Sequence, residues 1–232
     1  MLWDIDHTLI ETAGLGSRFY RAAFETITNR EMVEQADVTG KTEQAILTET
    51  LRMHRIEPTD DHQKRYAVEL ARQYEQHADL LRNTGRALPG AGQALTALAA
   101  VPGTVQTVLT GNLREVAFTK LRVFDLATPI DFEVGAYGED DSERAKLVPV
   151  AQDRAGAKYR TRFDDGNTVI IGDTTSDVTA ARQGGAQIVA VASGRDSEDE
   201  LRRAGADRVI PDLIETQRLV DAVQEALMRG AD

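Results

Sequence analysis

The stretch Trp3-Asp4-Ile5-Asp6-His7-Thr8-Leu9 decides how this chain can fold, because it places two carboxylates directly after an apolar start. The pattern predicts a buried strand that ends in an acidic loop. In an open parallel sheet, ligands bind beyond the carboxyl ends of the strands, so such a loop faces the ligand. One aspartate there can attack a phosphoryl group, and the second can act as general acid and base. Taken alone, the stretch also fits a solvated turn.

The composition of the 232 residues, 41% apolar and 28% charged, is typical of a globular protein. The net charge of −11 argues against binding to nucleic acid or to an anionic membrane. The absence of cysteine excludes disulfides and thiolate catalysis. With acidic residues at positions 4 and 6 and no long apolar run, we expect a cytoplasmic protein. Because only three residues precede Asp4, we also expect the native start to lie upstream of Met1.

Residues 14–85 have the periodicity of helices. Apolar residues recur every four positions from Leu15 to Ile27, and a second stripe runs from Tyr66 to Leu81. The segment Asn83–Gly90 is rich in helix-breaking residues and suits a domain crossing. We therefore predict an all-helical cap domain over residues 14–85, inserted after the acidic loop and placed to cover it as a lid.

From residue 86 onward the pattern alternates between strands and helices, which is typical of parallel βαβ units. The predicted fold class is α/β, with a Rossmann-like parallel sheet core flanked by helices. This core comprises residues 1–13 and 86–232. Its expected strands after the first are residues 105–109, a weaker one at 132–136, then 168–171, 187–192 and 208–210.

Two further strand ends carry polar residues suited to phosphate chemistry. Thr110 offers a hydroxyl, and the amides of Gly111 and Asn112 lie near the start of the next helix, a natural anion site. Asp173 and Asp177 follow the most apolar strand. Helix capping is the alternative in both places, by Asn112 in the first and by Ser176 or Asp177 in the second.

If these carboxylates converge with Asp4 and Asp6, each pair near ~4 Å repels by roughly 4 kcal/mol at an effective dielectric of 20. Such a cluster needs a cation. Carboxylate ligands close to a phosphate favour Mg²⁺, and no histidine cluster suggests zinc.

These motifs, in this order, resemble three of the four motifs of the haloacid dehalogenase-like (HAD) hydrolase superfamily. The spacing is similar to that of members with a helical cap, such as phosphoglycolate phosphatases. The resemblance implies that Asp4 is the nucleophile and a metal ligand. It also implies that Asp6 is the general acid and base, with its main-chain carbonyl on the metal. Thr110 would hold the phosphoryl group, Asp173 would complete the metal site, and Asp177 would ligate through water or orient its neighbours.

The chain departs from the family pattern at two places. His7 stands where the family usually has glycine; histidine tolerates positive φ, so a turn residue is favoured over a substrate contact. The basic third motif is ambiguous between Arg144 and Lys146, which both follow an acidic loop. Arg144 is favoured because it lies nearer the strand ends, and a surface charge remains the alternative for either.

The resemblance implies a hydrolase that acts on a small phosphorylated metabolite, as a monomer or homodimer. The additional aspartates argue against dehalogenation. Sugar phosphomutases of this layout carry an arginine where this chain has Glu43, which lowers but does not remove the mutase interpretation. A catalytically weak phospho-ligand-binding protein is the alternative from another class. In the cap, Lys41 is the candidate substrate contact, with a solvated loop charge equally compatible.

Overall fold

The computed structural model describes residues 1–229 and contains one five-stranded parallel sheet with the strand order β4-β1-β5-β6-β7. The α/β fold class is confirmed. The sheet strands are β1 (Leu2–Trp3), β4 (Thr107–Val108), β5 (Val169–Gly172), β6 (Gln187–Val191) and β7 (Val209–Ile210). Because β1 lies between β4 and β5, the acidic loop emerges between the other two predicted strand ends.

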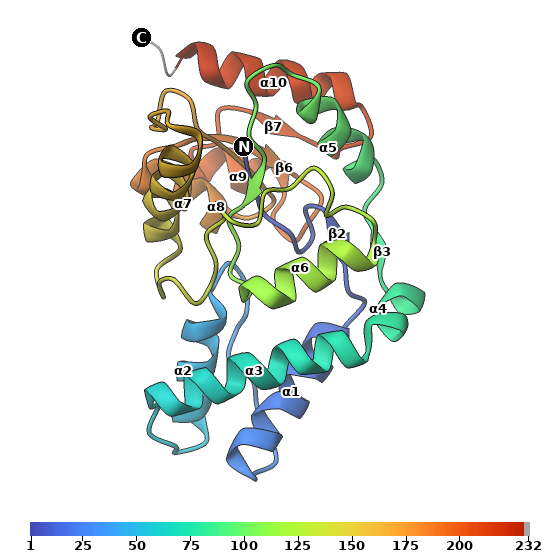
Figure 1. Cartoon of the computed structure of the whole chain (residues 1–232), viewed down its shortest axis with the longest axis vertical. Coiled ribbons are helices and arrows are strands. Elements are labelled where there is room, and N and C mark those ends of the chain that lie inside the picture. Colours follow the sequence, from blue (N-terminus) through green and yellow to red (C-terminus); the bar gives the residue numbers. More distant parts are fainter. Residues whose placement is uncertain (230–232) are drawn as a thin grey trace.

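Helices cover both faces of the sheet, as Figure 1 shows. Successive strand residues point to opposite faces, so Trp3 and Ile171 pack on one side while Leu2 and Ile170 pack on the other. The core helices are α5 (Ala91–Ala99), α6 (Arg114–Val123), α7 (Arg144–Tyr159), α8 (Thr175–Gly184), α9 (Glu198–Ala204) and α10 (Thr216–Arg229). The first face carries α5, α6 and α10, and the second carries α7, α8 and α9. Burial on both faces explains why the strands read as unbroken apolar runs.

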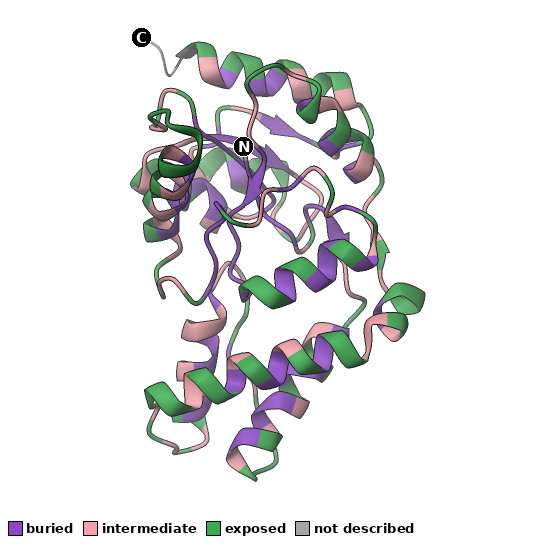
Figure 2. Ribbon diagram, viewed as in Figure 1, coloured by how far each residue is buried: buried purple, intermediate pink, exposed green. Residues whose placement is uncertain are grey.

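Residues 14–85, all of which the structure describes, contain helices and no strand. The helices are α1 (Leu15–Thr28), α2 (Glu43–Met53), α3 (Asp60–Gln76) and α4 (Ala78–Thr84). They share an apolar cluster with residues of α6, including Val116 and Val123, so α6 lies between the sheet and the insertion (Figure 1). Figure 2 shows that α3 has both buried and exposed residues. Its buried residues include Tyr66 and Leu70, which belong to this apolar cluster.

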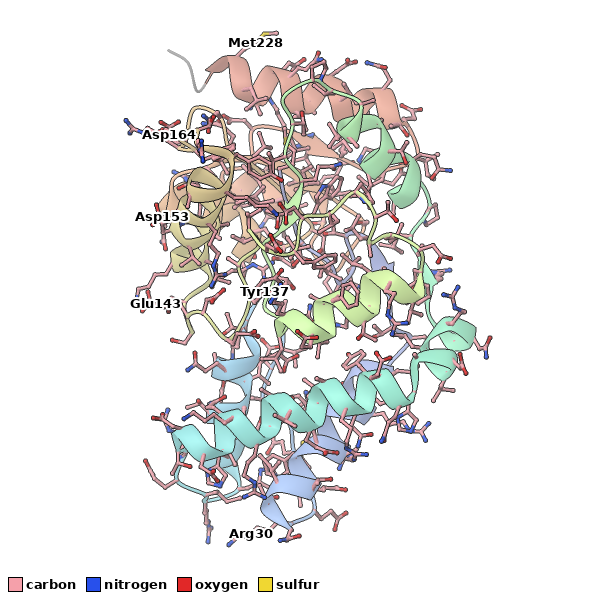
Figure 3. The ribbon with its side chains drawn as sticks, in the orientation of Figure 1. Arg30, Tyr137, Glu143, Asp153, Asp164 and Met228 are labelled. Carbon is pink, nitrogen blue, oxygen red and sulfur yellow. The ribbon has the colours of Figure 1, made fainter. Side chains whose placement is uncertain are left out.

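The chain leaves and re-enters the core through two adjacent strands that periodicity did not predict. β2 (Ile10–Glu11) pairs antiparallel with β3 (Arg86–Ala87), and Leu88 N donates to Leu9 O at 2.8 Å. This pair stands beside the expected domain crossing. In Figure 3, Arg30 marks the far end of the insertion and Met228 the opposite end of the core.

The predicted weak strand at residues 132–136 is wrong. Only an isolated bridge joins Leu109 to Ala136 there. The backbone instead turns around Asp131, whose side chain accepts from Glu133 N at 3.1 Å, and the Tyr137 hydroxyl donates to Phe132 O at 2.6 Å. These local hydrogen bonds replace those of a ladder.

Among the helices of residues 1–229, none combines the length and the apolar character that crossing a membrane requires.

We expect Phe24→Ala to lower the free energy of unfolding by about 3–5 kcal/mol, because Phe24 is fully buried in the inserted helices and truncation leaves a cavity. Urea titration followed by circular dichroism measures this change. Val68→Ala, at a position 72% exposed on α3, serves as the control and should stay within about 0.5 kcal/mol of the unmodified protein. Equal midpoints for the two variants would contradict the packing described.

Candidate active site

Asp4 lies at the carboxyl end of β1 and is buried, 7% exposed. Its backbone N–H donates to Ile171 O at 2.9 Å, which continues the sheet pairing into the loop. Arg144, the first residue of α7, donates from Nη2 to Asp4 Oδ1 and to Leu109 O. Burial raises the pKa of Asp4 to about 7 despite the opposing charge of Arg144, and the carboxylates of Asp177 and Asp6 act in the same direction as burial.

Asp177 fixes the guanidinium of Arg144 in place. Its Oδ1 accepts from Arg144 Nη2 at 2.7 Å and from Nε at 3.0 Å. Its Oδ2 accepts from the backbone N–H and the hydroxyl of Thr174, which forms a capping box at the start of α8. The cap residue is therefore Thr174, and Asp177 has both a structural and an electrostatic part in the site.

Asp173 follows β5 and faces the same space. Its Oδ1 accepts from the Thr8 hydroxyl at 2.8 Å. A Cβ at Gly194 would lie 1.7 Å from Asp173 Oδ2, so the loop after β6 can approach this carboxylate only with a glycine. Burial, then the charges of Asp4 and Asp177, raise the pKa of Asp173 to about 9.

The three carboxylates can hold a metal ion. One oxygen from each of Asp4, Asp173 and Asp177 lies within 4.8 Å of the others. Burial and then the neighbouring carboxylates raise the pKa values of Asp4 and Asp173, and a bound cation would offset the repulsion between these groups. A buried donor set made of oxygens fits a hard divalent cation.

Asp6 belongs to a second group of polar side chains, and the cation of this group, Lys120, lies outside the motifs of the sequence. Lys120 of α6 donates to both Asp6 oxygens at 2.7 and 2.8 Å and to Asn112 Oδ1 at 2.7 Å. Asn112 Nδ2 donates in turn to Asp6 Oδ2 at 2.7 Å. Burial alone would raise the pKa of Asp6, but the charge and hydrogen bonds of Lys120, with Asn112, lower it overall. The acid–base candidate is thus ionised in this arrangement.

The position of Lys120 in the sequence indicates that it is buried. The buried face of α6 includes Val116, Ala117 and Leu121, and Lys120 lies on the same stripe at the i+3 and i+4 positions. A lysine on a buried stripe needs a partner, since an unpaired buried charge is costly. Its partner could not be named before the tertiary structure brought α6 over the acidic loop.

Asn112 does not cap a helix, so that alternative is wrong. The residue before α6 is Leu113, and the backbone N–H of Arg114 donates to Glu139 instead. Asn112 rather donates from Nδ2 to the Thr110 hydroxyl oxygen at 2.8 Å. The Thr110 hydroxyl thus lies beside the group formed by Asp6, Asn112 and Lys120. Gly111 O accepts from Glu43 N at 2.8 Å, which brings the start of α2 to this strand end.

Of the remaining candidate residues, two line the central cavity and one does not. His7 has φ +65°, as expected for a turn residue, and both His7 and Lys41 line the cavity described below. The Lys41 ammonium pairs with Glu49 at 2.7 Å. Lys146 is 56% exposed, pairs with Glu143 and does not line the cavity, so the structure favours Arg144 as the basic group.

A cavity of about 400 Å³ joins these groups. The core supplies its acidic and basic floor, and the inserted helices supply its roof, where Tyr20, Ile46 and Tyr74 lie. Concave sites with a few convergent polar groups are typical of small-molecule binding. The insertion is therefore part of the site and not a separate appendage.

Comparison with known proteins agrees with this architecture. Residues 143–216 match a family model described as HAD-hydrolase-like. A hydrolase from Pseudomonas syringae is similar in structure, with TM-score 0.69, 23% identity and coverage of 96% of this chain and 97% of that one. A HAD hydrolase of family IA, variant 3, from Entamoeba histolytica gives TM-score 0.69, 19% identity and coverage of 96% and 98%.

A predicted phosphoglycolate phosphatase from Haemophilus somnus gives TM-score 0.62, 18% identity and coverage of 94% and 96%. Among curated proteins, the sequence comparison finds no match. The matched segment contains Arg144, Asp173 and Asp177, and the fold covers nearly the whole chain. The structural similarity shows that the chain has the fold of these proteins, and the matched segment is similar to the HAD-hydrolase-like family model, in agreement with the resemblance of the motifs.

Lys120→Met should lower the free energy of unfolding at pH 7 by about 2 kcal/mol, less than for a fully buried pair because the Asp6 side chain is 36% exposed. Since the folded-state pKa of Asp6 is lowered, its pairing stabilises the fold above the unfolded value of 3.8 and is lost as pH falls below it. The difference between variant and unmodified protein should therefore shrink below about pH 4.

Denaturant titrations at pH 7 and pH 3 measure both quantities. Lys146→Met, which removes an exposed ammonium, is the matched control and should change stability by less than about 0.5 kcal/mol at either pH. A Lys120→Met deficit that is the same at both pH values would show that Asp6 is not the group concerned.

Proposed function

We propose that this protein is a Mg²⁺-dependent phosphatase that hydrolyses a small phosphate monoester through a phosphoryl group carried on Asp4. The observation that carries the proposal is the separation of the two aspartates of the acidic loop. Asp4 lies with Arg144 and the carboxylate cluster, whereas Asp6 lies with Lys120 and Asn112. Two carboxylates in different electrostatic surroundings can take different chemical roles.

In the first step, a carboxylate oxygen of Asp4 attacks phosphorus and the bond to the alcohol oxygen breaks. Arg144 offsets charge on the transferring phosphoryl group, and the Thr110 hydroxyl lies at the neighbouring strand end to bind it. Asp6 is ionised in the free site, so it takes up a proton when the phosphate binds, and the departing alkoxide takes that proton from its carboxyl group. Lys120 lowers the pKa of that group, which makes its protonated form a stronger acid.

In the second step, water attacks the phosphoryl group on Asp4 and releases inorganic phosphate. Asp6, now ionised, accepts the proton of that water and is restored for the next cycle. A Mg²⁺ ion held by Asp4, Asp173 and Asp177 would neutralise the cluster and polarise the phosphoryl oxygens. The inserted helices line the cavity opposite these groups, which limits the entry of bulk water.

Asp4→Asn should lower kcat for phosphate release from p-nitrophenyl phosphate by on the order of 10⁴-fold or more, because an amide cannot replace the nucleophile. Phosphate release is measured with Mg²⁺ and with EDTA, and unmodified protein should be active only with the metal. The control is Asp125→Asn, a surface carboxylate paired with Arg82. Normal turnover in Asp4→Asn would remove Asp4 as nucleophile, and transfer of the phosphoryl group between sugar positions without net release would indicate a mutase.

Metal binding can be tested apart from turnover. Mg²⁺ at about 100 times its dissociation constant should stabilise the folded protein by about 2.7 kcal/mol, seen as a rise in melting temperature. Asp173→Asn should lose most of this rise because one of the three carboxylates is gone. An equal rise in Asp173→Asn and in the unmodified protein would place the ion elsewhere.

A further inference from the structure

Glu43 is the first residue of α2 and lines the cavity from the side of the insertion. Its backbone N–H donates to Gly111 O at 2.8 Å. Asn112, which follows Gly111 in the chain, donates from its side chain to Asp6. The charge of Asp6 also acts on the Glu43 carboxyl group. Glu43 therefore stands on the Asp6 side of the cavity. If the proposed function holds, this is the side from which the alcohol half of the ester departs.

The carboxyl group of Glu43 is held by a hydrogen bond and has no direct ion pair among the side chains that the structure describes. The Tyr66 hydroxyl, buried beneath it, donates to Glu43 Oε2 at 3.2 Å. Among the side chains of residues 1–228, no lysine or arginine forms an ion pair with Glu43. The charge of Lys120 acts on it through space, yet the Lys120 ammonium is hydrogen-bonded to Asp6 and Asn112. Burial of the carboxyl group raises the pKa of Glu43 to about 7.

The cations that line the cavity form their direct contacts with groups other than Glu43, and only Lys120 acts on it through space. In the described part of the chain, Lys41 pairs with Glu49 and Arg144 with the carboxylates of the floor. Arg195 donates to the Thr39 hydroxyl at 2.6 Å. The uncharged residues that line the cavity include Tyr20, Tyr74, Ile46 and Leu70. Asp6 and Glu43 therefore place acceptor oxygens on this side of the cavity, where the Lys120 ammonium is already hydrogen-bonded to Asp6.

We propose that Glu43 sets the substrate class: the alcohol released from the phosphate carries a hydroxyl or ammonium group that donates to the Glu43 carboxylate, and alcohols carrying a carboxylate are rejected. The proposal rests on the proposed phosphatase function and adds the chemistry of its leaving group. A hydrogen bond to a charged acceptor is stronger than a neutral one, and a carboxylate on the substrate would face Glu43 and Asp6 together. Phosphoglycolate, whose leaving alcohol carries a carboxylate, is on this basis a poor substrate.

The test uses esters of matched size: 2-hydroxyethyl phosphate, 2-aminoethyl phosphate, ethyl phosphate and phosphoglycolate. For the unmodified protein we expect kcat/KM for the better of the first two to exceed that for each of the others at least about tenfold. In Glu43→Gln the ratio of the better donor ester to phosphoglycolate should fall at least about tenfold. The ratio cancels any general loss of activity. The faster donor ester distinguishes a polyol phosphate from an amino alcohol phosphate.

Glu57→Gln, an exposed glutamate of the same insertion outside the cavity lining, is the control and should leave the ratio within about twofold. Should Glu43→Gln fail to fold by circular dichroism, Tyr66→Phe takes its place. That variant removes the hydroxyl that orients Glu43 and should lower the ratio about threefold.

A ratio unchanged in Glu43→Gln, or a preference of the unmodified protein for phosphoglycolate, would overturn the role of Glu43 while hydrolysis of p-nitrophenyl phosphate still upheld the phosphatase. Absence of hydrolysis of every ester, p-nitrophenyl phosphate included, would overturn both.

Discussion

The repulsion among buried carboxylates at the carboxyl edge of the sheet is the constraint on which this structure depends. Asp4, Asp173 and Asp177 lie within reach of one ion, and Arg144 meets two of them. Most of the surrounding local structure serves to hold these charges. The capping box at Thr174 orients Asp177, and the missing side chain at Gly194 leaves room for Asp173. A site assembled in this way is costly to fold and ready to bind a cation.

The two aspartates of the acidic loop have different electrostatic surroundings. Asp6 is two residues from Asp4, yet its carboxylate is directed to α6, where Lys120 and Asn112 stabilise the ionised form. The pKa values consequently move apart, that of Asp4 upward and that of Asp6 downward. Because α6 also packs against the inserted helices, the environment of Asp6 is linked to the position of the roof of the cavity.

The sequence predicted the alternation of strands and helices and the helical insertion, because long apolar stripes and buried strands carry strong periodicity. It also predicted the residues that meet at the strand ends, since parallel strands bring those ends to one edge. It failed where tertiary contact decides: the pairing of Lys120 with Asp6 joins positions 114 residues apart. The β2–β3 pair was missed because two-residue strands have no readable period, and residues 132–136 turn because of side-chain hydrogen bonds.

The neighbouring β2 and β3 strands have a consequence for how this protein could have diversified. Since the insertion begins and ends at adjacent points, the closing hydrogen bond between Leu88 and Leu9 belongs to the core alone. An ancestor could exchange, shorten or enlarge the inserted segment without changing the strand connections of the parallel sheet. The core and the inserted segment could then change on separate stretches of the gene, which are covalently connected next to this strand pair and also meet through α6.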